Sequence, residues 1–428
     1  MTLGAISQIL GVSPRVFVHT VIEAMLAEWM LRDKSAKAGF SLQALSLLWD
    51  IWYDLTMKKY SVLSSVRKIA ALAACSLTIS AMGAGKAAEP VKIIFDTDMI
   101  EDFDDVGALA CLHALADAGE CEILATVSAT RGNASVGVVE IINRYYGRPD
   151  IPVGAPKGMG VIGAHPGAKV KVDPAAPLAG NTRGHNKYRK LLADYPGWFR
   201  YADADDAPDA NDVYRRVLAA QPDGSVVICS VGFLTNIRRL LETKPDDISP
   251  LDGKALVAKK VKLWVAMACW YPRGAEYNSK WDAQSSRIAL DNWPTPIVFT
   301  DFQYGRDVFA GRVVAESKGP RNPVKDVFVG NLPSREAIRK DPAGNLRHCF
   351  GMAGRAAWDE TAVLFAVRGW EPYCNATRGT YRMIGSKGVN DWAPDEENGR
   401  HIRVTEKVSK AEVGRIIDEL MMRKPVKK

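Results

Sequence analysis

The chain has 428 residues, of which 47% are hydrophobic, and its formal net charge is +7. A chain of this length can bury a large core, either in one large domain or in two. Its lysine and arginine residues are scattered along the sequence, which argues against nucleic-acid binding through a basic face. The seven cysteines form no CxxC pair and no zinc-type Cys/His cluster, so those in apolar runs are expected to be buried free thiols: Cys111, Cys229 and Cys269.

The amino-terminal part of the chain has the layout of a secretory signal peptide. A basic stretch begins at Met57, an apolar run covers residues 69–83, and small residues follow. This order is typical of export signals that are removed from the mature protein. Because a signal peptide starts a natural protein, we predict that Met57 is the initiator and that residues 1–56 are a non-native extension. Residues 57–88 are then the signal peptide, and residues 89–428 form a single domain exported to the periplasm or the medium.

Two alternatives stay open for this segment. An amphipathic helix that lies on a membrane has an overlapping pattern. The tetrapeptide LAAC that ends at Cys75 resembles a lipobox, although the apolar run before it is short. No other stretch is apolar and long enough to span a bilayer, so no membrane association is expected once the signal has been cleaved.

From residue 91 onward, short apolar strands alternate with helical patterns. The predicted strands cover residues 91–95, 122–128, 225–230, 261–269 and 295–300. The predicted helices cover residues 105–118, 135–146, 283–292 and 355–368, and a further helix starts near residue 235. This alternation predicts an α/β fold with an open, mainly parallel sheet flanked by helices.

Two segments interrupt the alternation. Residues 157–206 and 311–346 lack clear periodicity and are rich in glycine, proline and charge. Long loops in compact domains often cover active sites. We therefore expect these segments to be loop or helical insertions near the functional site.

An acidic segment, FDTDMIEDFDD, occupies residues 95–105 and directly follows the first predicted strand. It holds six carboxylates: Asp96, Asp98, Glu101, Asp102, Asp104 and Asp105. Charges at this density repel one another unless a cation holds them together, and ligands of open α/β sheets bind at the carboxyl ends of strands. Ligands that offer only oxygen suit a hard cation such as calcium or magnesium. The alternative is a solvated acidic turn.

At this point the sequence resembles the inosine-uridine preferring nucleoside hydrolase family. Five blocks in chain order carry the resemblance: the DTD and Asp-Asp pair within residues 96–105, the Gly-Asn of residues 132–133, the SVGFLTN turn of residues 230–236, the GAEYN block of residues 274–278 followed by Asp282, and the Trp-Asp pair of residues 358–359. Each block alone is a weak signal, whereas five in the right order are a strong one. The resemblance extends over roughly residues 91–370.

The chain also departs from the family pattern. Its DTD and Asp-Asp are two positions further apart than in the best-known members, and Ile100 stands where glycine is usual. Trp358 stands where the family has histidine. The sequence therefore resembles a divergent DTDMxxDxDD branch, in which the roles of Asp96 and Asp102 stay open. Asp96 is a candidate for organising the loop without touching the metal.

The resemblance implies a calcium ion and a set of ligands for it. The carboxylates of Asp98, Asp105 and Asp359 and the backbone carbonyl of Val231 are the implied metal ligands. Asp98 would also take the proton of the attacking water. A carboxylate-bound calcium lowers the pKa of a bound water and can hold a ribose diol.

The resemblance also implies how a nucleoside would bind. The side chains implied for the ribose hydroxyls are Asp104, Asn133, Glu276 and Asn278, and Trp358 is expected to stack on the base or wall it off. The simpler readings are that Asp359 is only a helix N-cap, that Asn133 is an ordinary turn residue, and that Glu276 and Asn278, which alternate at strand spacing, form a polar edge.

The implied activity is calcium-dependent hydrolysis of the N-glycosidic bond of ribonucleosides, which yields ribose and the free base. The reaction passes through an oxocarbenium-like ribosyl cation and needs an activated water. The expected partner of the protein is a small-molecule nucleoside. Both a monomeric and a homo-oligomeric state are compatible with the sequence. The alternatives are a non-catalytic calcium-dependent binder of nucleosides or sugars, which the missing histidine before Asp359 favours, and a phosphohydrolase with an Asp nucleophile.

Overall fold

A computed structural model describes residues 89–99, 103–131, 134–158, 185–341, 344 and 346–426. The predicted extension and signal peptide, together with Asp102 and Asn133, lie outside these residues. No helix in the described part of the chain has the length and apolar character needed to cross a membrane.

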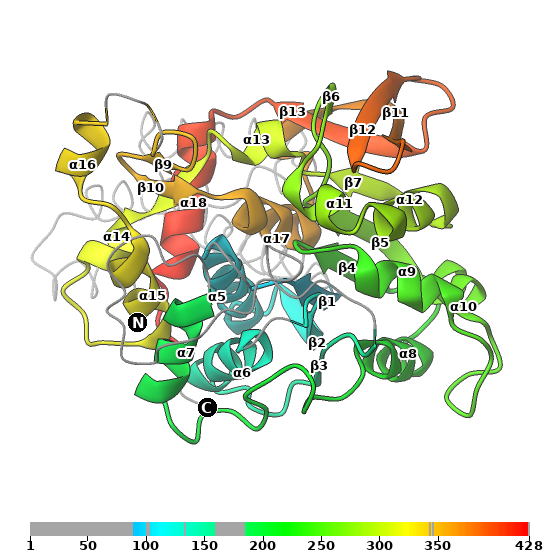
Figure 1. Ribbon diagram of the computed structural model, residues 1–428, viewed down its shortest axis with the longest axis horizontal. Helices are drawn as coiled ribbons and strands as arrows, with labels where there is room; N and C mark the ends of the chain where they lie inside the picture. Colours follow the sequence, from blue (N-terminus) through cyan, green and yellow to red (C-terminus); the bar gives the residue numbers. More distant parts are fainter. Residues whose placement is uncertain are drawn as a thin grey trace, which may run out of the picture. The chain divides into compact units, whose positions relative to one another are not determined.

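A large mixed sheet is the centre of the fold (Figure 1). Within the described residues it has ten strands, in the order β3-β2-β1-β4-β5-β7-β13-β11-β12-β6. Their bounds are β1 Val91–Thr97, β2 Cys121–Ser128, β3 Val153–Gly154, β4 Val226–Ser230, β5 Val261–Ala266, β6 Arg273–Gly274, β7 Ile297–Phe299, β11 Cys374–Ile384, β12 Val389–Pro394 and β13 His401–Glu406. The seven strands from β3 to β13 pair in parallel, and β11, β12 and β6 add an antiparallel edge. The mainly parallel α/β sheet predicted from the sequence is confirmed.

The strand order reverses beside β1. The chain runs from β1 to β2 and β3 on one side, and later returns to add β4, β5 and β7 on the other side. Ligands of such sheets bind outside the carboxyl ends of the strands at this switch point. The acidic segment follows β1 and the SVGFLTN turn begins at the last residue of β4, so both lie at the switch point.

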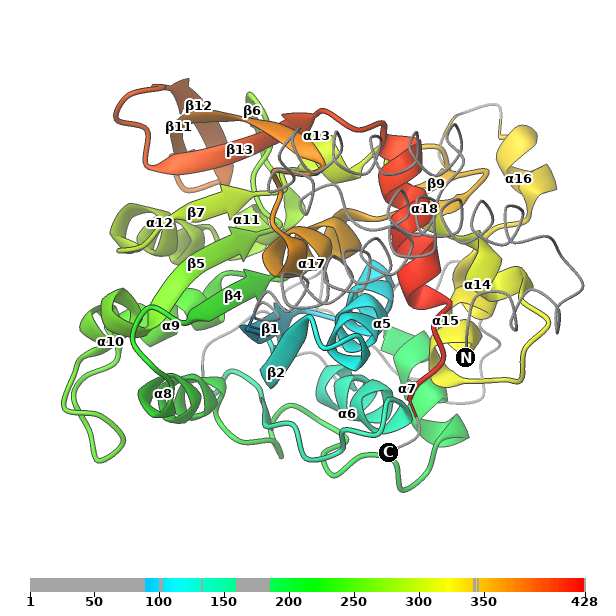
Figure 2. The same cartoon turned by 180° about the vertical axis from the view of Figure 1, so that it is seen from behind.

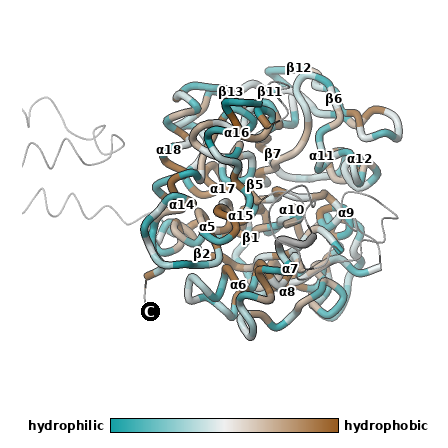
Figure 3. The backbone as a smooth tube through the Cα atoms, turned by 60° about the vertical axis from the view of Figure 1, so that its left-hand side comes forward, coloured by the Kyte–Doolittle hydropathy of each residue, from teal (hydrophilic) through white to brown (hydrophobic). Residues whose placement is uncertain are grey.

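Helices cover both faces of the sheet, as the two opposite views show (Figures 1 and 2). One face packs against α5 (Asp104–Asp117), α6 (Ser135–Tyr145), α17 (Trp358–Arg368) and α18 (Lys410–Met421). The other packs against α8 (Ala210–Ala220), α9 (Thr235–Glu242), α10 (Gly253–Lys260) and α12 (Ala283–Asn292). The hydropathy colouring shows hydrophobic chain gathered around β1, α5 and α17, whereas β11 is mostly hydrophilic (Figure 3).

The side chains of β1 explain why its sequence is a continuous apolar run. Ile93 and Phe95 belong to the core on the α5 side, whereas Ile94 belongs to the core on the α8 side. Successive side chains of a strand point to opposite faces, so a strand buried on both faces is apolar at every position. The same alternation places Val227 and Cys229 of β4 in the first core and Ile228 in the second.

The segment of residues 311–346, whose sequence has no clear periodicity, contains short helices, one of the two forms of insertion expected there. These are α14 (Arg312–Glu316), α15 (Pro323–Asn331) and α16 (Arg335–Arg339). The side chains of Asn322 and Ser334 cap the last two, and Pro323 occupies the first position of α15. The caps were visible in the sequence, but helices this short show little periodicity.

A second, small sheet was not predicted from the sequence. It contains β8 (Phe309–Gly311), β9 (Phe350–Gly351) and β10 (Gly354–Ala356) in the order β8-β10-β9. The predicted helix 355–368 therefore begins only at Trp358, because Arg355 is paired in β10 with Ala310 and Phe350. A three-residue strand is too short to show a period of two.

Candidate functional site

The first part of the site is the link between the end of β1 and the start of α5. Asp105, in the first turn of α5, accepts hydrogen bonds from the hydroxyl of Thr97 and, at 3.2 Å, from the backbone N–H of Met99. Met99 has a positive φ of 49°, a conformation that turns the chain sharply after Asp98. Asp105 therefore ties the DTD segment to the helix that carries the Asp-Asp pair.

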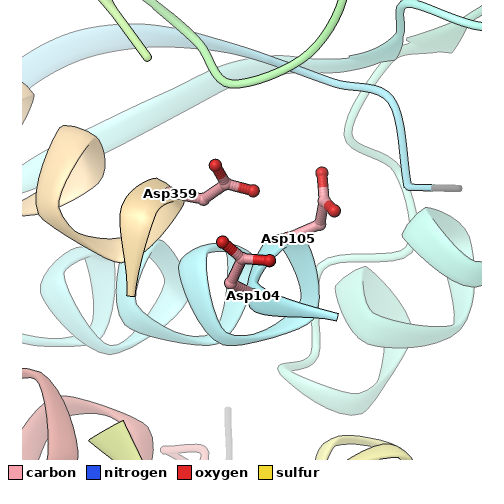
Figure 4. A group of neighbouring side chains, drawn as sticks. All are labelled: Asp104, Asp105 and Asp359. Carbon is pink, nitrogen blue, oxygen red and sulfur yellow. The ribbon is translucent and has the colours of Figure 1, made fainter. Parts of the chain in front are cut away.

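Three buried carboxylates meet next to this link. Asp104 and Asp105 come from the first turn of α5 and Asp359 from the first turn of α17. One oxygen of each lies within 4.8 Å of the others, and Figure 4 shows the three side chains turned toward a common centre. The positive ends of two helix dipoles favour carboxylates here, but three buried like charges still require a cation or protons. The all-oxygen donor set fits a hard cation such as calcium or magnesium.

A pocket opens over this carboxylate group. Its lining contains seven of the residues singled out in the sequence: Asp98, Asp104, Val231, Glu276, Asn278, Trp358 and Asp359. It also contains five that were not assigned a role there: Met267, Tyr277, Phe302, Cys349 and Arg355. The structure thus gathers side chains that are up to 261 positions apart in the sequence, from Asp98 to Asp359.

Glu276 and Asn278 line the pocket from the start of a short helix, and not from a strand. They do not alternate along a strand: Glu276 is the N-cap of α11 (Tyr277–Trp281), and Asn278 lies in its first turn. The Glu276 carboxylate accepts hydrogen bonds from the backbone N–H groups of Asn278, Ser279 and Cys269 and from the Ser279 hydroxyl. Burial raises the pKa of Glu276, and these hydrogen bonds oppose the rise.

Asn278 in turn fixes the end of β4. Its side-chain amide donates hydrogen bonds to the carbonyl oxygens of Val231, at 2.9 Å, and Met267, at 3.2 Å. A carbonyl oxygen has two lone pairs, so the Val231 oxygen keeps one acceptor direction for a further ligand. The next residue must be glycine, because a Cβ at Gly232 would lie 2.4 Å from the backbone nitrogen of Asp98.

Asp96, at the end of β1, is the buried centre of a hydrogen-bond network outside the pocket lining. Its carboxylate accepts hydrogen bonds from the hydroxyl of Tyr214 at 2.7 Å and from the amide of Asn236 at 3.2 Å. The same amide donates to the carbonyl oxygen of Ser128 at 2.7 Å. Burial raises the pKa of Asp96 to about 7, although the two hydrogen bonds lower it. Asp96 does not line the pocket; it joins β1 to α8 and α9, and Asn236 extends this network to β2.

Trp358 forms one wall of the pocket together with Phe302. The two rings stack at 5.2 Å between centroids and 27° between planes, and Trp270 stacks on Phe302 at 4.2 Å and 12°. The indole N–H of Trp358 donates to the carbonyl oxygen of Phe302 at 2.9 Å. Trp264 is fully buried in the core of the α8 face. The aromatic wall thus comes from Tyr277, Phe302 and Trp358, with Trp270 behind Phe302.

Arg355, which was not predicted from the sequence, is the cation of the pocket lining. Its Nε donates to Asp104 at 2.9 Å, and both side chains are buried. The guanidinium also lies over the rings of Phe103 and Trp358, with its carbon 5.1 and 5.4 Å from the ring centroids. No local sequence signal marked it, because its partner is 251 positions away.

These features agree with the comparison with known families. A family model described as inosine-uridine preferring nucleoside hydrolase matches residues 93–417. The chain belongs to this family. It is therefore a hydrolase that acts on N-glycosidic bonds, as the resemblance implied, and a phosphohydrolase finds no support. No curated protein sequence matches the chain.

Solved structures of two nucleoside hydrolases and of one effector protein share the fold. A plant nucleoside hydrolase matches with a TM-score of 0.51 and 16% identity over 78% of this chain and 99% of its own. A purine-preferring ribonucleoside hydrolase from Gardnerella vaginalis matches with a TM-score of 0.52 and 15% identity over 77% and 96%. The type III effector protein XopQ, complexed with adenosine diphosphate ribose, matches with a TM-score of 0.55 and 15% identity over 79% and 96%.

Proposed function

We propose that the protein hydrolyses the N-glycosidic bond of ribonucleosides with the help of a bound calcium ion, and releases ribose and the free base. The observation that carries this proposal is the buried group of Asp104, Asp105 and Asp359, of which Asp104 and Asp359 line a pocket with an aromatic wall. The carboxylates suit a cation and a sugar, and the aromatic rings suit a base.

The carboxylates of Asp98, Asp105 and Asp359 and the carbonyl oxygen of Val231 would hold the calcium ion. In support of this, Asp105 and Asp359 offer oxygens within 4.8 Å of each other, and Asp98 and Val231 line the same pocket. When bound, calcium lowers the pKa of a coordinated water and neutralises the carboxylates. Oxygen-only ligands and the need for several of them favour calcium over zinc.

Asp98 is the proposed general base for the attacking water. Its side chain is buried directly after the carboxyl end of β1 and lines the pocket. The positive φ of Met99 turns the chain sharply at the next residue. A carboxylate in this position can accept a proton from water while the developing ribosyl cation is stabilised by the surrounding negative charge.

The ribose hydroxyls would bind to Asp104, Glu276 and Asn278, and to Asn133, which lies outside the described residues. Hydroxyl groups donate to acceptors, and the described members of this set supply carboxylate oxygens and Oδ1 of Asn278, whose two N–H groups already donate to Val231 and Met267. Glu276 and Asn278 are held rigidly by the first turn of α11. A rigid site loses little conformational entropy when the substrate binds.

Trp358 would stack on the nucleobase. An indole N–H is a hydrogen-bond donor only and does not supply a proton at neutral pH, and here it already donates to Phe302. The base would therefore leave with help from solvent or from another residue. The protein would act on small molecules after export through the signal peptide that begins near Met57, either as a monomer or as a homo-oligomer.

The decisive experiment measures ribose release from a panel of nucleosides before and after removal of metal with a chelator. The proposal expects release by the untreated protein, loss with chelator, and recovery with added calcium. Asp359→Asn should prevent the recovery. A protein that binds nucleosides in the presence of calcium but releases no ribose would instead be the non-catalytic binder that the missing histidine favoured.

A further inference from the structure

The side chain of Asn390 binds both polar groups of the Trp270 backbone. Its Oδ1 accepts a hydrogen bond from the N–H of Trp270 at 2.8 Å, and its Nδ2 donates to the carbonyl oxygen of the same residue at 2.8 Å. Asn390 lies in β12, 120 positions after Trp270, and is fully buried. A buried amide whose oxygen and nitrogen are both bound has one orientation, so Asn390 fixes the Trp270 backbone in place.

The turn that carries Trp270 needs support. Cys269 has a positive φ of 72°, a conformation that is unfavourable for a residue with a side chain. The N–H of Cys269 donates to the carboxylate of Glu276 at 3.2 Å, and its carbonyl oxygen accepts from the N–H of Phe302 at 3.1 Å. Hydrogen bonds from three elements therefore hold this turn, and the pair to Asn390 comes from the antiparallel edge of the sheet.

The indole of Trp270 is the outermost of three stacked rings. Phe302 lies between Trp270 and Trp358, and the ring planes differ by 12° and 27°. Phe302 and Trp358 line the pocket, whereas Trp270 lies outside the lining. The backbone of β6 packs closely against the same indole, because a Cβ at Gly274, which pairs with Asn390, would lie 2.4 Å from its Cγ. Rings packed this closely cannot move independently, so a displaced Trp270 would also displace its two neighbours.

We infer that Asn390 is a positioning residue for the nucleobase: it holds Trp270, which in turn keeps Phe302 and Trp358 in place to contact the base. The inference rests on the proposed function, in which the aromatic wall receives the base, and gives the antiparallel edge of the sheet a role in substrate binding. Asn390 does not line the pocket, so its effect must pass through Trp270.

The proposed sugar ligands should be spared when Asn390 is changed. Glu276 keeps hydrogen bonds from the backbone N–H groups of Asn278 and Ser279 and from the Ser279 hydroxyl. These bonds lie within the first turn of α11 and do not involve Trp270. The inference therefore predicts a loss of affinity for the base and an unchanged affinity for the sugar.

The test compares a substrate that carries a base with one that does not. Inosine has a flat base that can contact the wall, whereas ribosyl fluoride offers the same sugar with a single-atom leaving group. Asn390→Leu has a similar volume but forms neither hydrogen bond. It should raise the KM for inosine about three- to tenfold, the range expected when an aromatic contact is lost. The KM for ribosyl fluoride and its kcat should change less than about twofold, because the sugar contacts remain.

A double-mutant cycle determines whether the effect passes through the indole. Trp270→Leu removes the stacking on Phe302 and should give the same selective rise in KM, whereas Trp270→Phe keeps a ring and should restore most of the affinity for inosine. In the Trp270→Leu background, Asn390→Leu should change the ratio of the two KM values less than about twofold further. Asn375→Leu is the matched control: its amide donates to the carbonyl oxygen of Glu406 in the same part of the sheet, and both KM values should stay unchanged.

Three results would overturn the inference. An equal rise of both KM values in Asn390→Leu would mean that Asn390 supports the whole site, and fully additive effects in the cycle would mean that it does not act through Trp270. If Asn390→Leu does not fold, Asn390→Ser, whose side chain is too short to bind both backbone groups, should show the selective rise, and an unaltered KM ratio in that variant is the third result. A wild type that releases ribose from neither substrate refutes the proposed function and with it the inference. A wild type that cleaves both, with an unaltered KM ratio in Asn390→Leu, refutes the inference alone.

Discussion

The side-chain amide of Asn278 donates a hydrogen bond to the carbonyl oxygen of Val231, at 2.9 Å, and thereby joins the start of α11 to the end of β4. A second bond runs from the same amide to Met267 after β5. Asn278 is thus a proposed sugar ligand, and its hydrogen bond also fixes the carbonyl group of Val231, a proposed metal ligand.

Asn278→Asp should destabilise the fold. A carboxylate cannot donate to the two carbonyl oxygens and would face them with a negative charge, so we expect a loss of about 1 to 3 kcal/mol in the free energy of unfolding. Urea denaturation measures the loss. The exposed Asn398 offers a control, since Asn398→Asp should be neutral. Equal free energies of unfolding for the two variants would show that the amide donors of Asn278 do not stabilise the fold.

A buried histidine should make the protein sensitive to acid. Nδ1 of His401 accepts a hydrogen bond from the backbone N–H of Tyr381 at 2.9 Å, and burial lowers the pKa of His401 from 6.5 to about 4. The unfolded chain then binds more protons than the folded one between these two values, so this contribution to stability is present above pH 6.5 and is lost as the pH falls toward 4.

His401→Asn isolates this contribution, because the asparagine carbonyl still accepts from Tyr381 but does not titrate. The loss of stability between pH 6.5 and 4 should be smaller in the variant by about 3 kcal/mol, because one pKa unit corresponds to about 1.4 kcal/mol. Denaturant midpoints at several pH values provide the measurement. Parallel pH profiles for the two proteins would mean that His401 does not contribute to the acid sensitivity.

We expect the departure of the base to limit the rate of hydrolysis. Since Trp358 does not act as an acid, activity should favour substrates with good leaving groups, such as p-nitrophenyl riboside, over ordinary nucleosides. Trp358→His should reduce the difference in kcat/KM between the two substrate types, because histidine titrates near neutral pH and can protonate the base. Ratios of kcat/KM for the paired substrates test this. Equal rates on both substrate types in the wild type would reveal an acid elsewhere in the pocket.

Cys349 provides a probe of the pocket that does not depend on turnover. It lines the pocket and is partly exposed, whereas the other cysteines in the described residues are buried. Alkylation followed by peptide mass spectrometry should therefore modify Cys349 before Cys121, and a bound nucleoside should slow the reaction at Cys349. Labelling that is indifferent to saturating nucleoside would place the ligand elsewhere.

Several features could be predicted from the sequence because they are local. The stretches of β1 and β4 at residues 93–95 and 226–229 are buried and apolar at every position, and the predicted helix after β1 differs from α5 by one residue at each end. The family match confirms the resemblance that the ordered motif blocks carried. The predictions about export and about the extension of residues 1–56 concern chain outside the described residues and stay predictions.

Other features required the tertiary structure. The sequence by itself determined that a dense row of carboxylates follows the first strand, because neighbouring residues on one segment are fixed by the covalent chain. Only the tertiary structure decided that Asp104 faces Arg355, 251 positions away, and that Phe302 stacks between Trp270 and Trp358. Such contacts depend on where α17 and the short strand β10 pack, and a three-residue strand leaves no periodic pattern in the sequence.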